Sequence, residues 1–256
     1  MTEHVQIAEQ AGVLSLILDR RAKKNALNDA MYGTLADALE RSETEPTIRV
    51  VVIRAEGDTF TAGNDLSDFA AVATSGVAGR NVGRFLQALL RASKPIVAAV
   101  QGRAVGIGTT MLLHCDYVLL ADDAQLTAPF VSLALVPEAA SSMLLPARIG
   151  HARAFAMFAL GEAVSARDAL AWGLANHVVP AAELLAATHA LAARFARQAI
   201  GALVATKKLM RTGELMARQM DLEGQEFLAR LRSPEAMEAF TAFAERRPPD
   251  FAKFDR

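Results

Sequence analysis

The chain has 256 residues and a formal net charge of −1, from 27 Lys and Arg against 28 Asp and Glu. This length, with 52% hydrophobic residues, can bury a sizeable core and argues against global disorder. The balanced charge gives no electrostatic reason to expect nucleic acid or an acidic membrane as the partner. The single Cys excludes an intrachain disulfide framework and a cysteine-based zinc cluster.

Targeting signals are missing from both ends of the chain. The first ten residues lack a basic start followed by an apolar stretch, and no apolar run approaches the ~18 residues of a membrane span. The C-terminal Phe254-Asp255-Arg256 is not the small tripeptide read by peroxisomal import. We therefore expect a cytoplasmic protein with no membrane and no nucleic acid among its partners.

The first half of the chain predicts alternating strands and helices. The β-branched run Val50-Val51-Val52-Ile53 is typical of a strand buried on both faces. The expected strands are 5–8, 13–18, 49–54, 95–100 and 117–121. The expected helices run from an N-cap at Asn28 to about Arg41, near 82–92, and from Gly106 through His114. This order predicts an α/β fold built from βαβ units.

After Pro137 the strand signal fades and helices dominate. We expect helices at 141–149, 151–160, 165–172, 181–197, 202–231 and 235–246, with one short extended segment at 177–179. The pattern divides the chain into an α/β core, residues 1–190, and a helical C-terminal region, residues 191–256.

Several common chemistries have no motif in this sequence. The five His residues form no metal-ligand pair such as H-E-x-x-H, and there is no G-x-S-x-G elbow and no phosphate loop. Gly102, Gly106 and Gly108 do not fit the dinucleotide-binding spacing. The neighbours His114 and Cys115 end an apolar helix, so we expect them to be packed there. No metal site is predicted.

Three segments follow buried strands and carry glycine or proline: 60–66, 98–108 and 128–142. With them, the chain resembles the crotonase superfamily, the enoyl-CoA hydratase/isomerase family, over nearly its whole length. Further matches are the Leu18-Asp19-Arg20 to Asn28 segment and the Gly173-Leu174 to Pro180 segment, with Arg21 and Ala175 as minor departures. The resemblance implies a crotonase-like (ββα) superhelix core with C-terminal helices that form homotrimers, often paired into hexamers.

The resemblance also implies a substrate and an oxyanion site. Family members bind an acyl-CoA thioester, so no cofactor beyond the CoA of the substrate is expected. Two backbone N–H groups would hold the thioester oxygen, and they map to Asn64 and Ile107. Gly63 would allow close approach of the backbone, and Ile107 would begin a helix, where amides are free. The alternative is that both segments are ordinary glycine turns.

The acid/base residue decides the reaction. The two glutamates of the family's hydratases map to Thr110 and Phe130, so hydration by the usual mechanism is not expected. Glu138 instead lies in a Pro-Glu-Ala-Ala-Ser-Ser segment, which resembles the P-E-G-C-S-S motif of peroxisomal-type Δ3,Δ2-enoyl-CoA isomerases. The segments 63–69 and 129–133 match the same branch. Glu138 is therefore predicted to move a proton, with an apolar surround raising its pKa. The alternative is that Glu138 caps the next helix.

Substrate binding is assigned largely by resemblance. Backbone groups near Lys24 and Ala26 would contact the adenine of CoA, although the basic loop around Lys24 could equally be a solvated surface loop. The loop from Leu66 to Arg80 would shape the acyl pocket, and Asp65 is expected to brace its loop. The candidate substrate-binding residues are Lys24, Ala26, Ala62, Gly63, Asp65, Leu66, Gly106 and Phe130. An enoyl-CoA isomerase is the favoured function; the alternatives are a hydratase, another crotonase-type reaction, or an inert acyl-CoA-binding paralogue.

Overall fold

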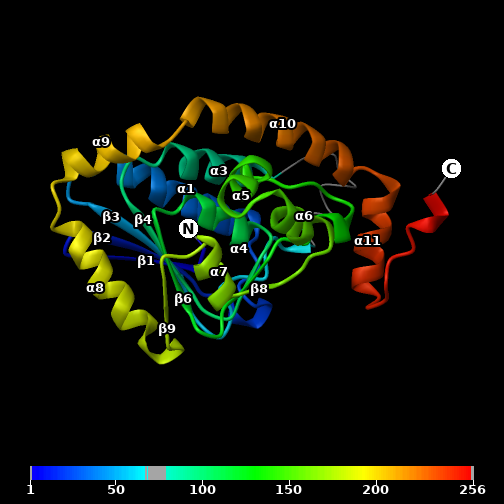
Figure 1. Ribbon diagram of the computed structural model, residues 1–256, viewed down its shortest axis with the longest axis horizontal. Coiled ribbons are helices and arrows are strands. Elements are labelled where there is room, and N and C mark those ends of the chain that lie inside the picture. Colours follow the sequence, from blue (N-terminus) through cyan, green and yellow to red (C-terminus); the bar gives the residue numbers. More distant parts are fainter. Residues whose placement is uncertain (1, 67, 69–78, 255–256) are drawn as a thin grey trace.

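A computed structural model describes residues 2–66, 68 and 79–254 of the chain. Its centre is a six-stranded sheet in the order β1-β2-β3-β4-β6-β9 (Figure 1). β1 and β2 form an antiparallel hairpin, and every other neighbouring pair is parallel. The strands are β1 (Val5–Gln10), β2 (Val13–Leu18), β3 (Val50–Ala55), β4 (Ile96–Val100), β6 (Tyr117–Ala121) and β9 (His177–Val179).

A smaller sheet lies beside the site-forming loops. Its three strands are β5 (Arg103–Val105), β7 (Gln125–Thr127) and β8 (Val164–Ser165). These strands are two or three residues long, too short for the alternation of a sequence pattern to reveal them, and none of the three was predicted.

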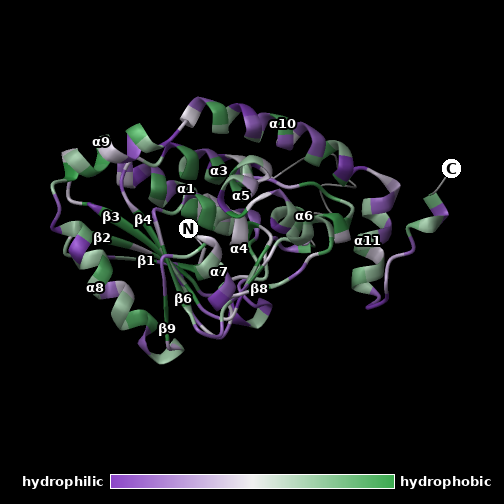
Figure 2. Cartoon of the chain, in the orientation of Figure 1, coloured by the Kyte–Doolittle hydropathy of each residue, from purple (hydrophilic) through white to green (hydrophobic). Residues whose placement is uncertain are grey.

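Alternate residues of the parallel strands enter two separate cores. On β3, Val51 and Ile53 join the main hydrophobic cluster, while Val50 and Val52 join a second cluster on the opposite face. Helix α8 (Leu184–Ala196) covers this second face, with Leu191 in that cluster. Both faces of the sheet are therefore buried, which explains the continuous apolar runs seen as green strands in Figure 2.

Helices of the first half close the main core and approach the site. α1 (Asp29–Thr44) begins as predicted at the N-cap Asn28, whose Oδ1 accepts a 2.9 Å hydrogen bond from the amide of Met31. α3 (Arg80–Arg91) packs along α1, and the two rings Tyr32 and Phe85 lie 5.4 Å apart. The shorter helices are α4 (Ile107–Thr110), α5 (Ser141–Ile149), α6 (His151–Ala159) and α7 (Ala166–Trp172).

The C-terminal helices run across one side of the molecule (Figure 1). They are α9 (Ile200–Met210), α10 (Gly213–Leu231) and α11 (Pro234–Ala244). The prediction of one helix over 202–231 is wrong, because the chain leaves the helical conformation at Arg211 and Thr212. At this break the guanidinium of Arg211 donates to the carbonyl of His114 at 3.1 Å, a tertiary contact that local propensity does not encode. The domain division at residue 190 stays a prediction, and that residue lies inside α8.

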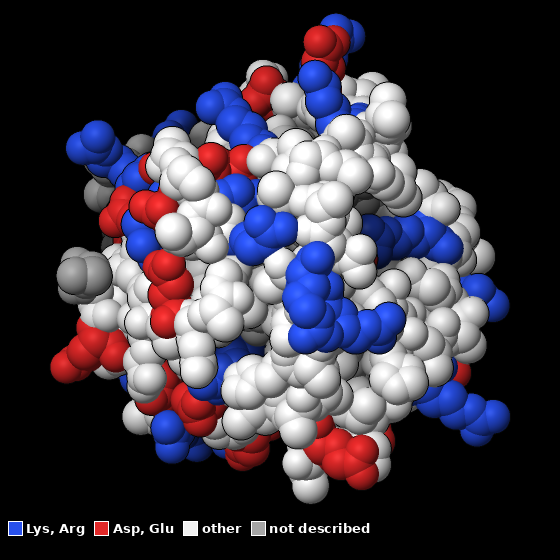
Figure 3. Space-filling model, turned by 90° about the vertical axis from the view of Figure 1, so that its left-hand side faces the viewer, with Lys and Arg blue, Asp and Glu red and all other residues white. Residues whose placement is uncertain are grey.

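Large apolar side chains remain exposed on the C-terminal helices. They are Leu209, Met210, Leu215, Leu222, Leu228, Met237 and Phe243. Association of protomers through these helices, as trimers or hexamers, stays a prediction. On the side where α8 and α9 meet, Figure 3 shows basic side chains near the centre and acidic ones toward the edges, so both signs share this face. Among the described helices, none is both long and apolar enough to cross a membrane.

The loop between β2 and α1 depends on one buried amide side chain. Asn25 is buried with a positive φ of 54°, and its Oδ1 accepts a 2.7 Å hydrogen bond from the amide of Arg20. Its Nδ2 donates to the carbonyls of Glu56 and Thr59 at 2.9 and 2.7 Å. The side chain thus joins the loop that carries Lys24 to the loop that follows β3.

We expect Asn25→Ala to lower the free energy of unfolding by about 2–4 kcal/mol, since three backbone groups would lose their partner. The exposed Lys23→Ala in the same loop is the control and should change stability by less than about 0.5 kcal/mol. Urea unfolding of the three proteins measures both values. Equal stability of Asn25→Ala and the wild type would contradict the role given to this side chain.

Candidate active site

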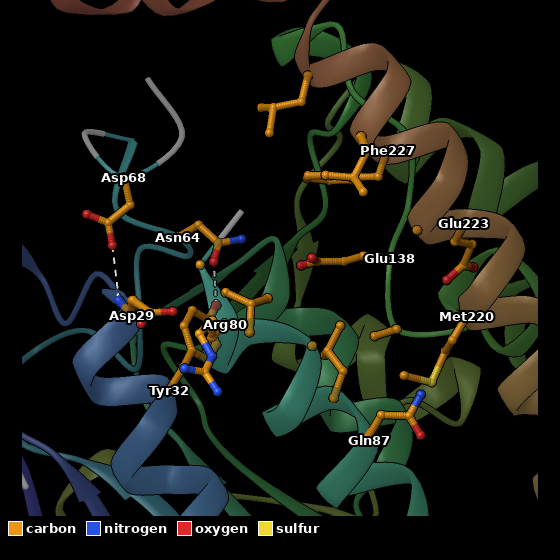
Figure 4. A pocket seen from close by; sticks show the side chains of 18 of the residues that line it. Asp29, Tyr32, Asn64, Asp68, Arg80, Gln87, Glu138, Met220, Glu223 and Phe227 are labelled. Atoms are coloured by element: carbon orange, nitrogen blue, oxygen red, sulfur yellow. Dashed lines mark hydrogen bonds between the residues drawn. The ribbon is translucent and has the colours of Figure 1, made fainter. Parts of the chain in front are cut away.

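A cavity of about 1010 Å³ opens between α1, α3 and α10. The predicted residues Glu138 and Asn64 both line it, together with Tyr32 from α1 and with Met220 and Phe227 from α10. Figure 4 shows the Glu138 carboxyl pointing into this space, toward the side where Asn64 lies. The fold therefore brings together two residues that are 74 positions apart in the sequence.

Glu138 is buried in the wall of the cavity. Glu138 is only 7% exposed to solvent, and its Oε1 has no hydrogen-bond partner among the described residues. Burial raises the pKa of Glu138 to about 8, and the nearby charge of Glu223 adds to the shift. A carboxyl group with this pKa holds its proton at neutral pH, and its ionised form is a stronger base than an exposed glutamate, as general acid/base work requires.

The interpretation of Glu138 as a helix cap is wrong. α5 begins at Ser141, its N-cap is Ala140, and no side chain of that N-cap residue closes the helix. The carboxylate at this helix end is instead Glu223, whose Oε1 accepts from the amide of Ser142 at 2.9 Å. The Glu138 side chain is left to the cavity.

The loop that carries Glu138 has an unusual backbone. Ala139 and Ala140 have φ values of 64° and 54°, in the left-handed region that costs about 1–2 kcal/mol per non-glycine residue. The first of the two stands where the resemblance places a glycine. Such a conformation persists only when the surroundings impose it.

Two groups from other elements hold this loop. Glu223 Oε2 on α10 accepts from the amide of Ala140 at 2.6 Å. On the other side, Nε2 of His114 lies 2.7 Å from the carbonyl oxygen of Ala139. Burial lowers the pKa of His114 to about 4, so the ring is neutral at neutral pH and its Nε2–H donates to that carbonyl. His114 is packed at a helix end, as predicted, and it positions the loop.

Glu223 was not identified from the sequence, although a signal exists. It occupies a buried position on the face of α10 formed by Met216, Met220 and Leu231. A carboxylate at an apolar position of an amphipathic helix rarely lacks a partner. Tyr32 was also missed; its hydroxyl donates to Oδ1 of Asn64 across 32 positions of sequence.

The two predicted oxyanion amides lie on adjacent segments. Thr61 and Ala104 form a parallel bridge, and the amide of Val105 donates to the carbonyl of Thr61 at 3.0 Å. Asn64 and Ile107 are each three residues further along these segments. The two segments remain close at this point. A Cβ added to Gly63 would lie only 2.9 Å from the carbonyl oxygen of Val105.

The local backbone directs both amides away from ladder partners. The parallel bridge between Leu27 and Asn64 uses the carbonyl of Gly63 and the amide of Asp65, so the Asn64 amide faces the opposite side. Ile107 is the first residue of α4, where an amide has no acceptor within the helix. Gly63 and Gly106 have φ values of 91° and 57°, which a side chain would make costly. The oxyanion role of the two amides stays a prediction.

Lys24, Ala62 and Val105 line a second, smaller pocket of about 560 Å³. The Lys24 ammonium is exposed and pairs with the carboxylate of Asp58 at 2.9 Å. Asp65 braces its loop as expected, because its carboxylate lies 2.6 Å from the guanidinium of Arg20. The same guanidinium donates to the carbonyl of Ala26 at 2.9 Å.

Two further predicted positions, Phe130 and Leu66, do not line the cavity. Phe130 is buried, and its ring packs 6.0 Å from that of Phe158. Leu66 packs against the main core. Most of the loop expected to shape the acyl pocket, Ser67 and residues 69–78, lies outside the described residues. No group of three or more His, Cys, Asp or Glu within the described part of the chain could hold a metal ion.

Comparison with known proteins places this site in a family. The sequence profile of the enoyl-CoA hydratase/isomerase family matches residues 8–254. The chain belongs to this family. An enoyl-CoA hydratase/isomerase structure from Pseudoalteromonas atlantica T6c superposes with a TM-score of 0.91 at 43% identity, covering 97% of this chain and 100% of that one. The expected crotonase fold is therefore confirmed.

Relatives with established names differ in reaction. The 1,2-epoxyphenylacetyl-CoA isomerase of Escherichia coli is 34% identical over 98% of this chain and 99% of its own length. The enoyl-CoA delta isomerase 2 of Rattus norvegicus is 30% identical over 95% of this chain and 64% of its own length. Other relatives of similar identity are named hydratases. The comparisons show the family, and the reaction has to be argued from the site.

The raised pKa of Glu138 predicts a pH-dependent stability. A carboxyl whose pKa rises from 4.5 to about 8 on folding stabilises the folded state fully below pH 4.5, and this contribution is lost as the pH rises through 8. Between these values the loss reaches at most ~1.4 kcal/mol per pH unit. Glu138→Gln removes the titration, so its stability should increase relative to the wild type from pH 5 to 9.

Urea unfolding at several pH values measures this difference. Glu162→Gln, at an exposed position, is the matched control and should follow the wild type throughout. Parallel stability curves for the wild type and Glu138→Gln would contradict a buried, proton-retaining carboxyl.

Proposed function

We propose that this protein is an enoyl-CoA isomerase, which moves a double bond from position 3 to position 2 of an acyl-CoA thioester. The observation that carries the proposal is the buried carboxyl of Glu138, which points into the main cavity without a partner for Oε1 among the described residues. Double-bond migration needs one group that removes a proton and returns it nearby. A carboxyl poised between its two protonation states supplies this group.

In the proposed reaction, the Glu138 carboxylate takes a proton from C2 of a 3-enoyl-CoA. The C2–H electron pair forms a C1–C2 double bond, and negative charge moves to the thioester oxygen. The amides of Asn64 and Ile107 donate hydrogen bonds to that oxygen and stabilise the dienolate. The Glu138 carboxyl then returns its proton to C4, the double bond forms between C2 and C3, and the carboxylate is regenerated.

The residues at the family's hydratase positions favour isomerisation over hydration. Addition of water needs one group to activate the water and another to donate a proton. Thr110 is a buried hydroxyl on α4 that cannot act as a base near neutral pH, and Phe130 has no titratable group. Glu138 would have to perform both tasks alone. The Pro-Glu-Ala-Ala-Ser-Ser segment also supports isomerisation, because it resembles the corresponding motif of the peroxisomal-type isomerase branch.

The remaining parts of the proposal concern binding and assembly. The loop around Lys24 and Ala26 would bind the adenine and phosphate end of CoA, and the main cavity would bind the acyl chain. The exposed apolar side chains of α9, α10 and α11 would be covered in a homotrimer or hexamer. No cofactor beyond the CoA of the substrate is proposed.

We expect Glu138→Gln to lower the rate of 3-enoyl-CoA conversion by about 10²–10⁴-fold, the usual effect of losing a general acid/base. Acyl-CoA binding should change little, because the amide has the shape of the carboxyl. A spectrophotometric assay of 2-enoyl-CoA formation and calorimetric binding of a saturated acyl-CoA measure the two quantities.

Glu162→Gln serves as the exposed control and should keep the wild-type rate. A Glu138→Gln variant that retains the wild-type rate would refute the assignment. Tight binding of acyl-CoA by a wild type without turnover would instead identify an inert binding protein.

A further inference from the structure

Helix α10 carries a second carboxylate close to the proposed base. Glu223 and Glu138 line the same cavity, but their settings differ. In Figure 4, the Glu138 carboxyl points into the cavity, while Glu223 lies on α10, on the other side of the loop that carries Glu138. We propose that Glu223 is a positioning residue, which fixes this loop and places a negative charge behind Glu138.

The hydrogen bonds of Glu223 favour an ionised carboxylate. Oε2 accepts from the amide of Ala140, and Oε1 accepts from both the amide and the hydroxyl of Ser142. The Ser142 oxygen is itself the acceptor of a 2.8 Å hydrogen bond from the side-chain amide of Gln219, so its proton points to Glu223. All three partners are donors, and they bind an ionised carboxylate more strongly than a neutral carboxyl group.

These bonds counter the strain of the Glu138 loop. Ala139 and Ala140 hold positive φ values, and the donors to Glu223 are the amides on either side of Ser141, where α5 begins. A carboxylate near the first amides of a nine-residue helix is stabilised by them in return. His114 contacts the loop through the Ala139 carbonyl, while Glu223 binds its amides.

The charge of Glu223 also acts on Glu138 directly. Burial is the first cause of the raised pKa of Glu138, and the negative charge of Glu223 is the second. Burial also raises the pKa of Glu223, but its three donors oppose that shift. Within the described part of the chain, no group donates to Oε1 of Glu138, so Glu223 ionises first and Glu138 holds the proton.

Several other charged groups around the pair have hydrogen-bond or ion-pair partners of their own. Of those that line the cavity, Asp65 pairs with Arg20, Asp29 binds Asn81, and Asp68 accepts from the amide of Asp29. The cavity also borders on Tyr32, Arg80 and Asp221. On the helices packed against α10, the charged groups with described partners are Arg84 of α3, Arg148 of α5, and Glu235 and Glu238 of α11.

Two substitutions separate the charge of Glu223 from its geometry. Glu223→Gln removes the charge and places an amide nitrogen against a donor, so the Glu138 pKa should fall. The acid limb of kcat/KM for 3-enoyl-CoA should then move from about pH 8 to lower pH by about one unit. Glu223→Asp keeps the charge but shortens the reach. It should leave the limb in place and lower the plateau by about 100-fold, as expected for a misplaced base.

Glu226→Gln, an exposed position on the same helix, is the matched control and should change neither quantity. A purely structural role for Glu223 would lower activity equally at every pH. An unmoved acid limb in Glu223→Gln therefore overturns the proposal. If that variant does not fold, a wild-type plateau in Glu223→Asp overturns it instead.

This inference rests on the proposed function for its kinetic readout, so a second readout needs no turnover. The infrared band of the protonated Glu138 carboxyl, assigned by its loss in Glu138→Gln, gives the pKa directly. A lower pKa in Glu223→Gln supports the positioning role even if 3-enoyl-CoA is not converted. Conversion of 3-enoyl-CoA with an unmoved band would leave the proposed function standing and contradict the role of Glu223.

Discussion

Burying the Glu138 carboxyl without a partner for Oε1 among the described residues is the constraint around which the site is arranged. A buried polar atom without a hydrogen bond costs about 1–3 kcal/mol, so the surrounding structure has to supply that free energy elsewhere. Here the cost is met by keeping the proton at neutral pH rather than by a salt bridge. The same burial makes the carboxyl a stronger base than an exposed glutamate. The free-energy cost of burying Glu138 and its strength as a base therefore have one cause.

The fold supplies the rest of the site through pairs of adjacent elements. The short bridge between Thr61 and Ala104 aligns the segments that end in Asn64 and Ile107. The loop before α5 is held from both sides, by α10 and by the helical turn that contains His114. The proposed acid/base group and the two proposed oxyanion amides therefore lie on segments that hydrogen bonds hold to neighbouring elements, as a proton-transfer site needs to keep its geometry.

The sequence predicted the local features well because local chemistry determines them. The apolar run at Val50 marked a strand buried on both faces, Asn28 marked the start of α1, and α5 was predicted with its observed bounds. Glu138 was found from a motif. Glu223 was not, because its partners lie more than 80 residues away in the sequence. The break at Arg211 was also missed; at this point the Arg211 guanidinium contacts the carbonyl of His114, which lies in another element.

The central claim is that one buried glutamate moves a double bond and adds no water. The most direct measurement incubates 3-enoyl-CoA and 2-enoyl-CoA separately with the wild-type protein in ¹⁸O-labelled water and follows the products by mass spectrometry. The account predicts that 3-enoyl-CoA becomes 2-enoyl-CoA without a change in mass, and that 2-enoyl-CoA gains no oxygen. Formation of ¹⁸O-labelled 3-hydroxyacyl-CoA as the main product of either substrate would contradict it.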